Sequence, residues 1–133
     1  MIKHLSIDNT DILVESAEVL DRGGIIVYPT DTLYGFGVDA RDKTAIDKIN
    51  KIKGRNSPMS VIAANFEQLL SWTIVSDIEL DLVNENIGEK TTFILPAVEG
   101  VIHGSILGPD NTIGIRIPTH PFGPDLVAKI GYP

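Results

Sequence analysis

The sequence has no cysteine, few aromatic residues and no long apolar run. Because none of the 133 residues is cysteine, disulfide bonds and thiolate catalysis are excluded. No apolar stretch approaches the ~20 residues that a membrane helix needs, and the opening residues MIKHLSIDNT lack the layout of a signal peptide. A G-x-x-x-x-G-K-[ST] run is also missing, which excludes an ordinary P-loop ATPase. We therefore expect a cytoplasmic protein.

Basic residues are scarce as well. The chain has 11 Lys and Arg against 18 Asp and Glu, a formal net charge of −7, which disfavours nucleic-acid binding unless the cations are gathered. They are gathered: six of the 11 lie between Arg41 and Arg55. For the cluster as a whole a solvated helix face is the better interpretation. For Lys53 and Arg55 we favour an anion site, because of their position at a predicted helix end.

The remaining composition is typical of one soluble globular domain, which we place at 1–133. Hydrophobic residues make up 43% and charged residues 22% of the chain, enough for a single core. The three histidines, His4, His103 and His120, show no metal-ligand spacing. We therefore predict no structural metal site.

Hydrophobic periodicity predicts alternating helices and strands, and hence an α/β fold with a largely covered sheet. Helices are expected at 11–22, 42–53, a short segment after Asn65, 76–87 and 124–130. Strands are expected at 24–28, 33–38, 59–63, 91–95 and 112–117.

Capping residues predict where these helices begin and end, and rows of apolar residues predict which side of each helix faces the core. Thr10 is expected to cap the first helix, whose apolar stripe is Leu13, Ala17 and Leu20. In the second helix the residues expected to face inward are Ala45, Ile49 and Ile52, and Gly54 suits a left-handed C-terminal position. Asn65 with Gln68, and Ser76 with Glu79, resemble capping boxes, and Gly88 and Gly131 are expected to end their helices.

The run YPTDTLYGFGVDA at 28–40 is the most informative segment. It follows a β-branched stretch that reads as a buried strand, which Pro29 ends because proline cannot donate to a sheet. Asp31, Thr32 and Tyr34 would then lie at the carboxyl end of a core strand, where open α/β sheets place ligands. The alternative is an ordinary turn, with Gly35 and Gly37 only shaping a bend.

PTDTLYG at 29–35 and Lys53-Gly54-Arg55 together resemble the YrdC-like family of threonylcarbamoyl-AMP synthases. Weaker agreement continues at 92–95 and 114–118. The resemblance implies a twisted mixed sheet with flanking helices and an open basic cleft. It also implies a reaction that joins L-threonine, bicarbonate and ATP into threonylcarbamoyl-AMP and pyrophosphate, for the modification of a tRNA adenosine. Mg²⁺ would be carried with the ATP.

The resemblance assigns roles to six residues. Thr32 and Tyr34 match positions that hold threonine and its carbamate, and Lys53 and Arg55 match a catalytic, nucleotide-binding Lys-x-Arg motif. Thr92 and Arg116 match nucleotide contacts, and Ser60 has weaker support.

Each of these residues also has a plain structural interpretation. The alternatives are core packing for Tyr34, pairing with the helix dipole for Lys53 and Arg55, and a buried salt bridge for Arg116. Thr92 is also an ordinary strand residue. Asp31 is expected to fix the turn through backbone N–H groups.

Three departures from the family pattern matter. Asn56-Ser57-Pro58-Met59 carries no basic residue, and Gly88-Glu89-Lys90 replaces a Pro-Gly-Pro segment, although Lys90 adds charge. In the family a further core strand with a Ser-x-Asn signature follows a stretch like Gly131-Tyr132-Pro133, where this chain ends. We therefore expect a C-terminally truncated domain that lacks part of its site.

Two other functions compete with the synthase. One is a non-catalytic module of the same fold that binds tRNA or double-stranded RNA, which the net charge of −7 disfavours. The other is a carbamoyl-transfer domain of hydrogenase maturation, which belongs to larger proteins with cysteine-rich zinc fingers. For the synthase, tRNA and downstream threonylcarbamoyl-transfer proteins are the expected partners, and no membrane is involved.

Overall fold

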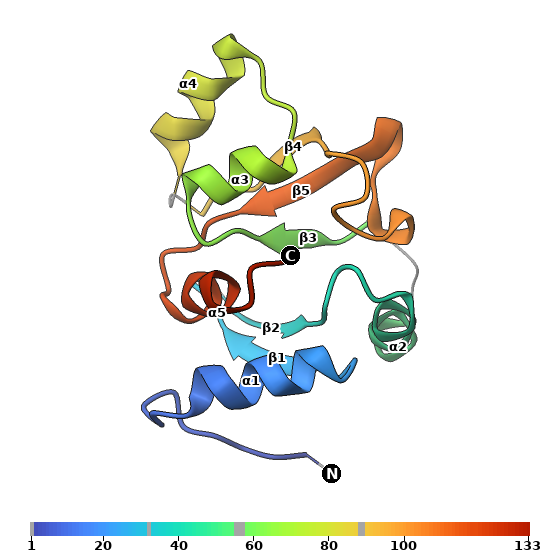
Figure 1. Ribbon diagram of the computed structural model, residues 1–133, viewed down its shortest axis with the longest axis vertical. Helices are drawn as coiled ribbons and strands as arrows, with labels where there is room; N and C mark the ends of the chain where they lie inside the picture. Colours follow the sequence, from blue (N-terminus) through green and yellow to red (C-terminus); the bar gives the residue numbers. More distant parts are fainter. Residues whose placement is uncertain (1, 32, 55–57, 88–89) are drawn as a thin grey trace.

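A computed structural model describes residues 2–31, 33–54, 58–87 and 90–133, and within them the predicted α/β fold is confirmed (Figure 1). The helices are α1 (Ile12–Asp21), α2 (Lys43–Lys53), α3 (Phe66–Trp72), α4 (Asp77–Asn86) and α5 (Phe122–Ile130). The strands are β1 (Ile26–Pro29), β2 (Tyr34–Gly37), β3 (Ser60–Ile62), β4 (Phe93–Pro96) and β5 (Thr112–Arg116). Short 3₁₀ turns cover Gly104–Ile106 and Pro109–Asn111. None of the described helices is both long and apolar enough for a membrane span.

The strands form two sheets. One is mixed, with the order β3-β5-β4: β3 runs parallel to the central strand β5, and β4 runs antiparallel to it. The other is an antiparallel pair, β1-β2, in which Val27 lies opposite Phe36 and Tyr28 opposite Gly35. The expectation that the first strand is buried is wrong for one face, since Val27 is 60% exposed.

The larger hydrophobic cluster surrounds the mixed sheet. Ile113 and Ile115 of β5, Leu69 of α3 and Ile46 of α2 are each no more than 1% exposed. Alternate residues of β5 point to one face, as strand geometry requires, so Ile113 and Ile115 enter the core together. Gly114 and Arg116 share the opposite face. Because of this alternation, β5 buries Ile113 and Ile115 in the core and presents the charged side chain of Arg116 on its other face.

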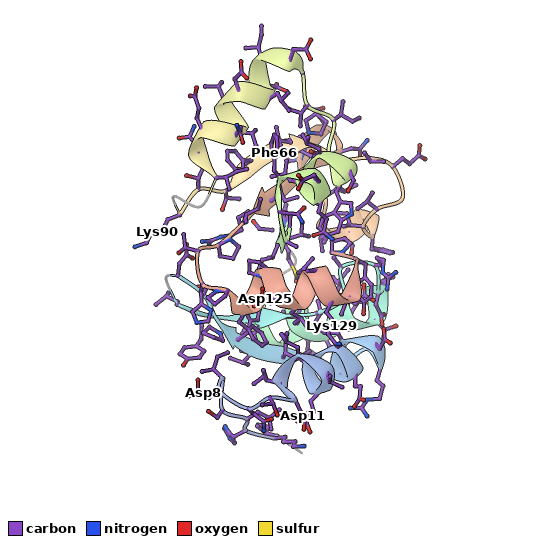
Figure 2. The ribbon with its side chains drawn as sticks, turned by 60° about the vertical axis from the view of Figure 1, so that its left-hand side comes forward. Asp8, Asp11, Phe66, Lys90, Asp125 and Lys129 are labelled. Carbon is purple, nitrogen blue, oxygen red and sulfur yellow. The ribbon has the colours of Figure 1, made fainter. Side chains whose placement is uncertain are left out.

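The smaller cluster joins α1, α5 and the inner face of the β1-β2 pair. Its buried members are Leu20, Phe122 and Leu126, with Ile26 and Tyr28 packed against them. Helix α5 contacts both β1 and β3, so it spans the two parts of the molecule. Figure 2 shows Asp125 and Lys129 of α5 between Phe66, at the start of α3, and Asp11, before α1.

Most helix ends follow the local sequence. Ser76 and Glu79 form a complete capping box, with Ser76 accepting from the Glu79 N–H and Glu79 from the Ser76 N–H. Gly54 and Gly131 take left-handed conformations at φ 70° and 78°, as predicted. The expected end of α4 at Gly88 lies outside the described residues.

Three local predictions are wrong. The residue before α1 is Asp11 rather than Thr10, and it makes no side-chain cap. Ile52 is 58% exposed, and Ile46 takes its place in the core. Asn65 caps α3 as expected, but Gln68 accepts from the Ala64 N–H instead of closing the box on Asn65.

Candidate functional site

A cavity of about 480 Å³ lies between the two sheets. Its walls are built by β1 and β2, by α2 and α5, and by β3 with the end of β5. Most of the lining is apolar, and its polar side chains are Tyr28, Thr30, Tyr34, Asp39, Lys53, Ser60 and Arg116. A largely apolar cavity with a few polar groups is the usual form of a small-molecule site.

Lys53 lies where the sequence predicted, at the end of α2 and on the cavity lining. Gly54 stops the helix there, so the lysine leaves from its last turn, where the helix dipole favours a cation. Among the described residues its ammonium has no carboxylate within 4.0 Å. Within the part of the chain that the structure describes, Lys53 is thus a cation on the cavity lining with no ion-pair partner, since Asp39, a carboxylate on the same lining, is paired with Arg41. Arg55, its predicted companion, lies outside the described residues, so the open basic cleft stays a prediction.

Other basic residues of the cluster are already engaged. Arg41 binds Asp39 at 2.9 Å, and Lys43 binds Asp47 at 2.7 Å on the surface of α2. Lys48 donates to the carbonyl of Gly23 at 3.2 Å. The interpretation as a solvated helix face is supported for Lys43, whereas Arg41 lies before α2 and Lys48 reaches a carbonyl outside the helix.

Tyr34 opens β2 opposite Pro29 and lines the cavity with 76% of its surface exposed. Such exposure rules out the alternative of core packing. Beside it, Thr30 and Leu33 bond each other in a turn, with the Thr30 hydroxyl donating to the Leu33 carbonyl and accepting from its N–H. Thr32 lies outside the described residues, so its role as a threonine contact stays a prediction.

Arg116 pairs with Asp31, 85 residues away, through one N–H that donates to Oδ1 at 2.6 Å. The side chains are 22% and 4% exposed, which confirms the buried salt bridge that was the alternative for Arg116. Asp31 thus bonds an arginine, and among the described residues no backbone N–H donates to its side chain, so the expected role in fixing the turn stays a prediction. The pair links the end of β1 to the end of β5, across the two sheets.

The Asp31–Arg116 pair is incompletely bonded. In the part of the chain that the structure describes, Oδ2 of Asp31 and Nε of Arg116 are buried without a hydrogen-bond partner. Buried polar atoms are nearly always satisfied, and the exceptions need an explanation.

Tyr28 is a cavity residue that sequence reasoning did not single out. Its ring lies over β2, where a Cβ on Gly37 would come within 2.8 Å of Cε1, closer than real contacts allow. Phe122 of α5 packs on it with ring centroids 6.1 Å apart. Burial raises the pKa of the Tyr28 hydroxyl, an effect that the charge of Arg116 partly offsets. The sequence did carry a signal for this contact: the alternating glycines of the run YGFG at 34–37 leave room for an aromatic ring such as Tyr28 on the paired strand.

The side chains of Ser60, in β3, and Thr92, just before β4, both lie next to Gly114 of β5. Ser60 is paired with Gly114 across β3 and β5 and lines the cavity. The side chain of Thr92 also lies next to Gly114, but Thr92 is not part of the cavity lining. The structure thus brings Tyr34, Lys53 and Arg116 to one cavity and leaves Thr92 outside it. No three His, Cys, Asp or Glu side chains of the described ranges come together as a metal site.

Comparison with known proteins adds independent evidence. A family model named Sua5_yciO_yrdC and described as "Telomere recombination" matches residues 18–133. A Vibrio campbellii protein named threonylcarbamoyl-AMP synthase is 31% identical over 121 residues, covering 87% of this chain and 65% of its own length. Escherichia coli YciO, whose name carries the description "uncharacterized", is 29% identical over 126 residues, or 92% of this chain and 60% of its own length.

Two solved structures resemble the chain at 28% identity. The crystal structure of E. coli YciO superposes with a TM-score of 0.79 over 94% of this chain and 62% of its own. Sua5 of P. abyssi, crystallised in complex with L-threonine, gives a TM-score of 0.79 over 91% of this chain and 36% of its own. The chain thus spans about 60% of the length of the YciO protein that it matches.

Proposed function

The chain belongs to the Sua5/YciO/YrdC family, and from that premise we propose that it carries the nucleotide and threonine site of an L-threonylcarbamoyl-AMP synthase. The observation that carries the proposal is Lys53, whose ammonium has no carboxylate partner among the described residues and which lies at the end of a helix, on the lining of a cavity of about 480 Å³. An anionic ligand is the natural partner of such a group. Two relatives support the choice of ligands, one by its name as a threonylcarbamoyl-AMP synthase and one by its complex with L-threonine.

The proposed reaction consumes L-threonine, bicarbonate and ATP. The threonine amine and bicarbonate condense to a carbamate with loss of water, and a carbamate oxygen then attacks the α-phosphorus of ATP. The bond to the β-phosphate breaks and pyrophosphate leaves, which yields threonylcarbamoyl-AMP. Reactions of this kind depend on positioning and charge stabilisation and need no covalent nucleophile. The absence of cysteine is therefore no obstacle.

In this proposal Lys53 attracts and orients the polyphosphate, which arrives with Mg²⁺ held by its own oxygens and by water. Arg55 adds a second cation, and Thr32 and Tyr34 offer hydroxyls to the threonine end. The product passes to proteins that transfer the threonylcarbamoyl group to a tRNA adenosine. The alternative of a non-catalytic RNA-binding module is weakened, because Arg41 and Lys43 already bind carboxylates and Lys48 a backbone carbonyl.

The test is product formation by the chain itself. We would incubate it with ATP, Mg²⁺, L-threonine and bicarbonate, and measure pyrophosphate release together with the mass of threonylcarbamoyl-AMP. We expect both products, and we expect Lys53→Ala to lower the rate by about 100-fold, in the range for the loss of one charge-stabilising group. Lys51→Ala is the matched control, because Lys51 lies on the same last turn of α2 but does not line the cavity. Pyrophosphate release that is equal in the two variants would contradict the role of Lys53.

A further inference from the structure

Helix α4 has apolar residues on two different faces. Val83 and Ile87 point inward and pack into the cluster around the mixed sheet. Ile78 and Leu82, one turn apart, form an outer apolar pair whose members are 80% and 58% exposed. A surface helix normally confines its apolar residues to the face that packs on the core, and a helix that is apolar on further faces is normally buried. The fold of the described residues thus leaves the second apolar face of α4 uncovered.

The same helix is strongly acidic. From 56 to 89 the sequence has six Asp and Glu and no Lys, Arg or His, so this stretch carries six of the seven net negative charges of the chain. Asp77, Asp81 and Glu85 are exposed and follow one another along α4 at intervals of four residues, beside the outer apolar pair. Among the described residues, none of these three carboxylates has a cation within 4.0 Å.

This combination of apolar and acidic side chains restricts what can cover the helix. Uncompensated carboxylates repel nucleic acids and anionic lipid headgroups. A symmetric dimer through α4 would set the carboxylates of one copy against those of the other. A surface that carries apolar residues of its own, with Lys or Arg beside them, would bury the outer apolar pair and neutralise the carboxylates together.

We propose that the outer face of α4 is a docking surface for a basic amphipathic helix of a partner protein. The ten residues of α4 extend for about 15 Å, which about three turns of a partner helix cover. Laid along α4, the partner places apolar residues, spaced three and four apart, on the outer apolar pair. Its Lys or Arg residues then lie beside Asp81 and Glu85, as the charged flanks of helical zippers do.

The docking surface is separate from the candidate catalytic site. Figure 1 shows α4 at the end of the molecule opposite α1. No residue of α4 belongs to the described lining of the cavity. A partner helix on α4 therefore leaves the cavity open, and the inference does not rest on the proposed function.

The test uses a synthetic probe. A fluorescent amphipathic peptide of about 14 residues, made of leucine and lysine with the leucines at helical spacing, would be titrated with the native chain and followed by anisotropy. The matched peptide carries glutamate in place of every lysine. We expect the lysine peptide to bind at least about tenfold more tightly, because like charges across an interface are strongly unfavourable. Its binding should also weaken as salt is added.

Leu82→Ser and Ile52→Ser form a matched pair, because each side chain is 58% exposed and lies on a helix. Ile52 lies between Lys51 and Lys53 in the sequence, so its substitution should leave the binding of the lysine peptide unchanged. Leu82→Ser should weaken that binding by about tenfold or more, in the range for an apolar anchor of an interface. Asp81→Lys should weaken it by a similar factor. Circular dichroism would establish that these surface variants fold.

The inference is overturned if the lysine peptide does not bind, if the glutamate peptide binds as tightly, or if Leu82→Ser and Asp81→Lys leave binding unchanged. Sedimentation of the chain alone and flotation with phosphatidylcholine vesicles test the other occupants. We expect the native chain to stay monomeric and unbound to vesicles. Self-association or vesicle binding that Leu82→Ser abolishes would assign the face to a second copy or to a lipid surface, and would also overturn the inference.

Discussion

The two hydrophobic clusters differ in how completely they are closed. Around the mixed sheet, Ile46, Leu69 and Ile115 are fully buried. In the cluster at the β1-β2 pair the buried members among the described residues are Leu20, Phe122 and Leu126, and on the outer face of the pair Val27 is 60% and Phe36 44% exposed. The cavity lies between these two regions, bounded by strands of both.

This difference in packing means that the residues that stabilise the fold and the residues that could bind a ligand lie in different regions. A close-packed cluster has no room for a ligand, because protein interiors reach the density of organic crystals. The candidate site occurs where packing stops, with polar groups supplied from the ends of β1, α2 and β5. We therefore expect substitutions in the mixed-sheet cluster to change stability, and substitutions at the cavity to change ligand affinity more than stability.

The largest expected effect is in the mixed-sheet cluster. Ile115→Ala should destabilise the fold by about 4 kcal/mol, because the side chain is fully enclosed and its removal leaves a void. Leu126→Ala, which borders the cavity from α5, should cost only about 2 kcal/mol, since it enlarges a space that already exists. Urea unfolding of the three proteins measures both values. Equal losses would mean that the two clusters are equally closed, against our comparison.

The next effect concerns the ion pair between the two regions. Arg116→Gln should cost about 3 kcal/mol, because it leaves the Asp31 carboxylate buried without a cation. The double variant Asp31→Asn with Arg116→Gln should cost less than the single one, since no charge is then buried. A double-mutant cycle from denaturant unfolding gives the coupling. If the double variant loses as much unfolding free energy as the two single variants lose together, or more, then the two side chains do not stabilise each other.

The smallest effect is at the end of the chain. The Tyr132 hydroxyl donates to Asp21 at 2.9 Å, and the Arg41 guanidinium lies 3.6 Å from the centre of its ring. Burial, with help from that hydrogen bond, raises the pKa of Tyr132 from 10.0 to about 12. The folded state therefore keeps the phenol proton longer than the unfolded chain, and stability should fall as the pH rises from about 10 to 12.

Tyr132→Phe isolates this effect. The stability difference between the native chain and the variant should be constant below pH 10 and shrink toward pH 12. Urea midpoints at a series of pH values measure it, and the change should be small because the phenol is partly solvated. A difference that stays constant up to pH 12 would show that the hydroxyl has an ordinary pKa in the folded state.

The features predictable from sequence are those decided within one or two turns of chain. The Ser76–Glu79 box and the left-handed Gly54 depend only on neighbouring residues, and both predictions are confirmed. The prediction that Ile52 faces the core was wrong, and Ile46 is buried instead. The apolar residues of this helix are compatible with more than one buried face until the packing partner of the helix is known.

Contacts between distant segments were out of reach for the same reason. That Asp31 pairs with Arg116, 85 residues away, depends on how the two sheets meet, and composition does not encode this. The position of the Tyr28 ring over Gly37 depends on the strand register, which decides which residues of β1 and β2 lie opposite each other. The position of Lys53 at the end of a helix was predicted correctly, because Gly54 next to it ends the helix. That helix end also borders the cavity.

The most direct test of the central claim is calorimetric titration of ATP into this chain, with and without L-threonine. If one cavity between the two clusters holds both ligands, ATP should bind, and L-threonine should strengthen its binding by several-fold through linkage. Lys53→Ala should weaken that binding while Lys51→Ala leaves it unchanged. The absence of ATP binding, or ATP binding that ignores both L-threonine and Lys53, would contradict the account.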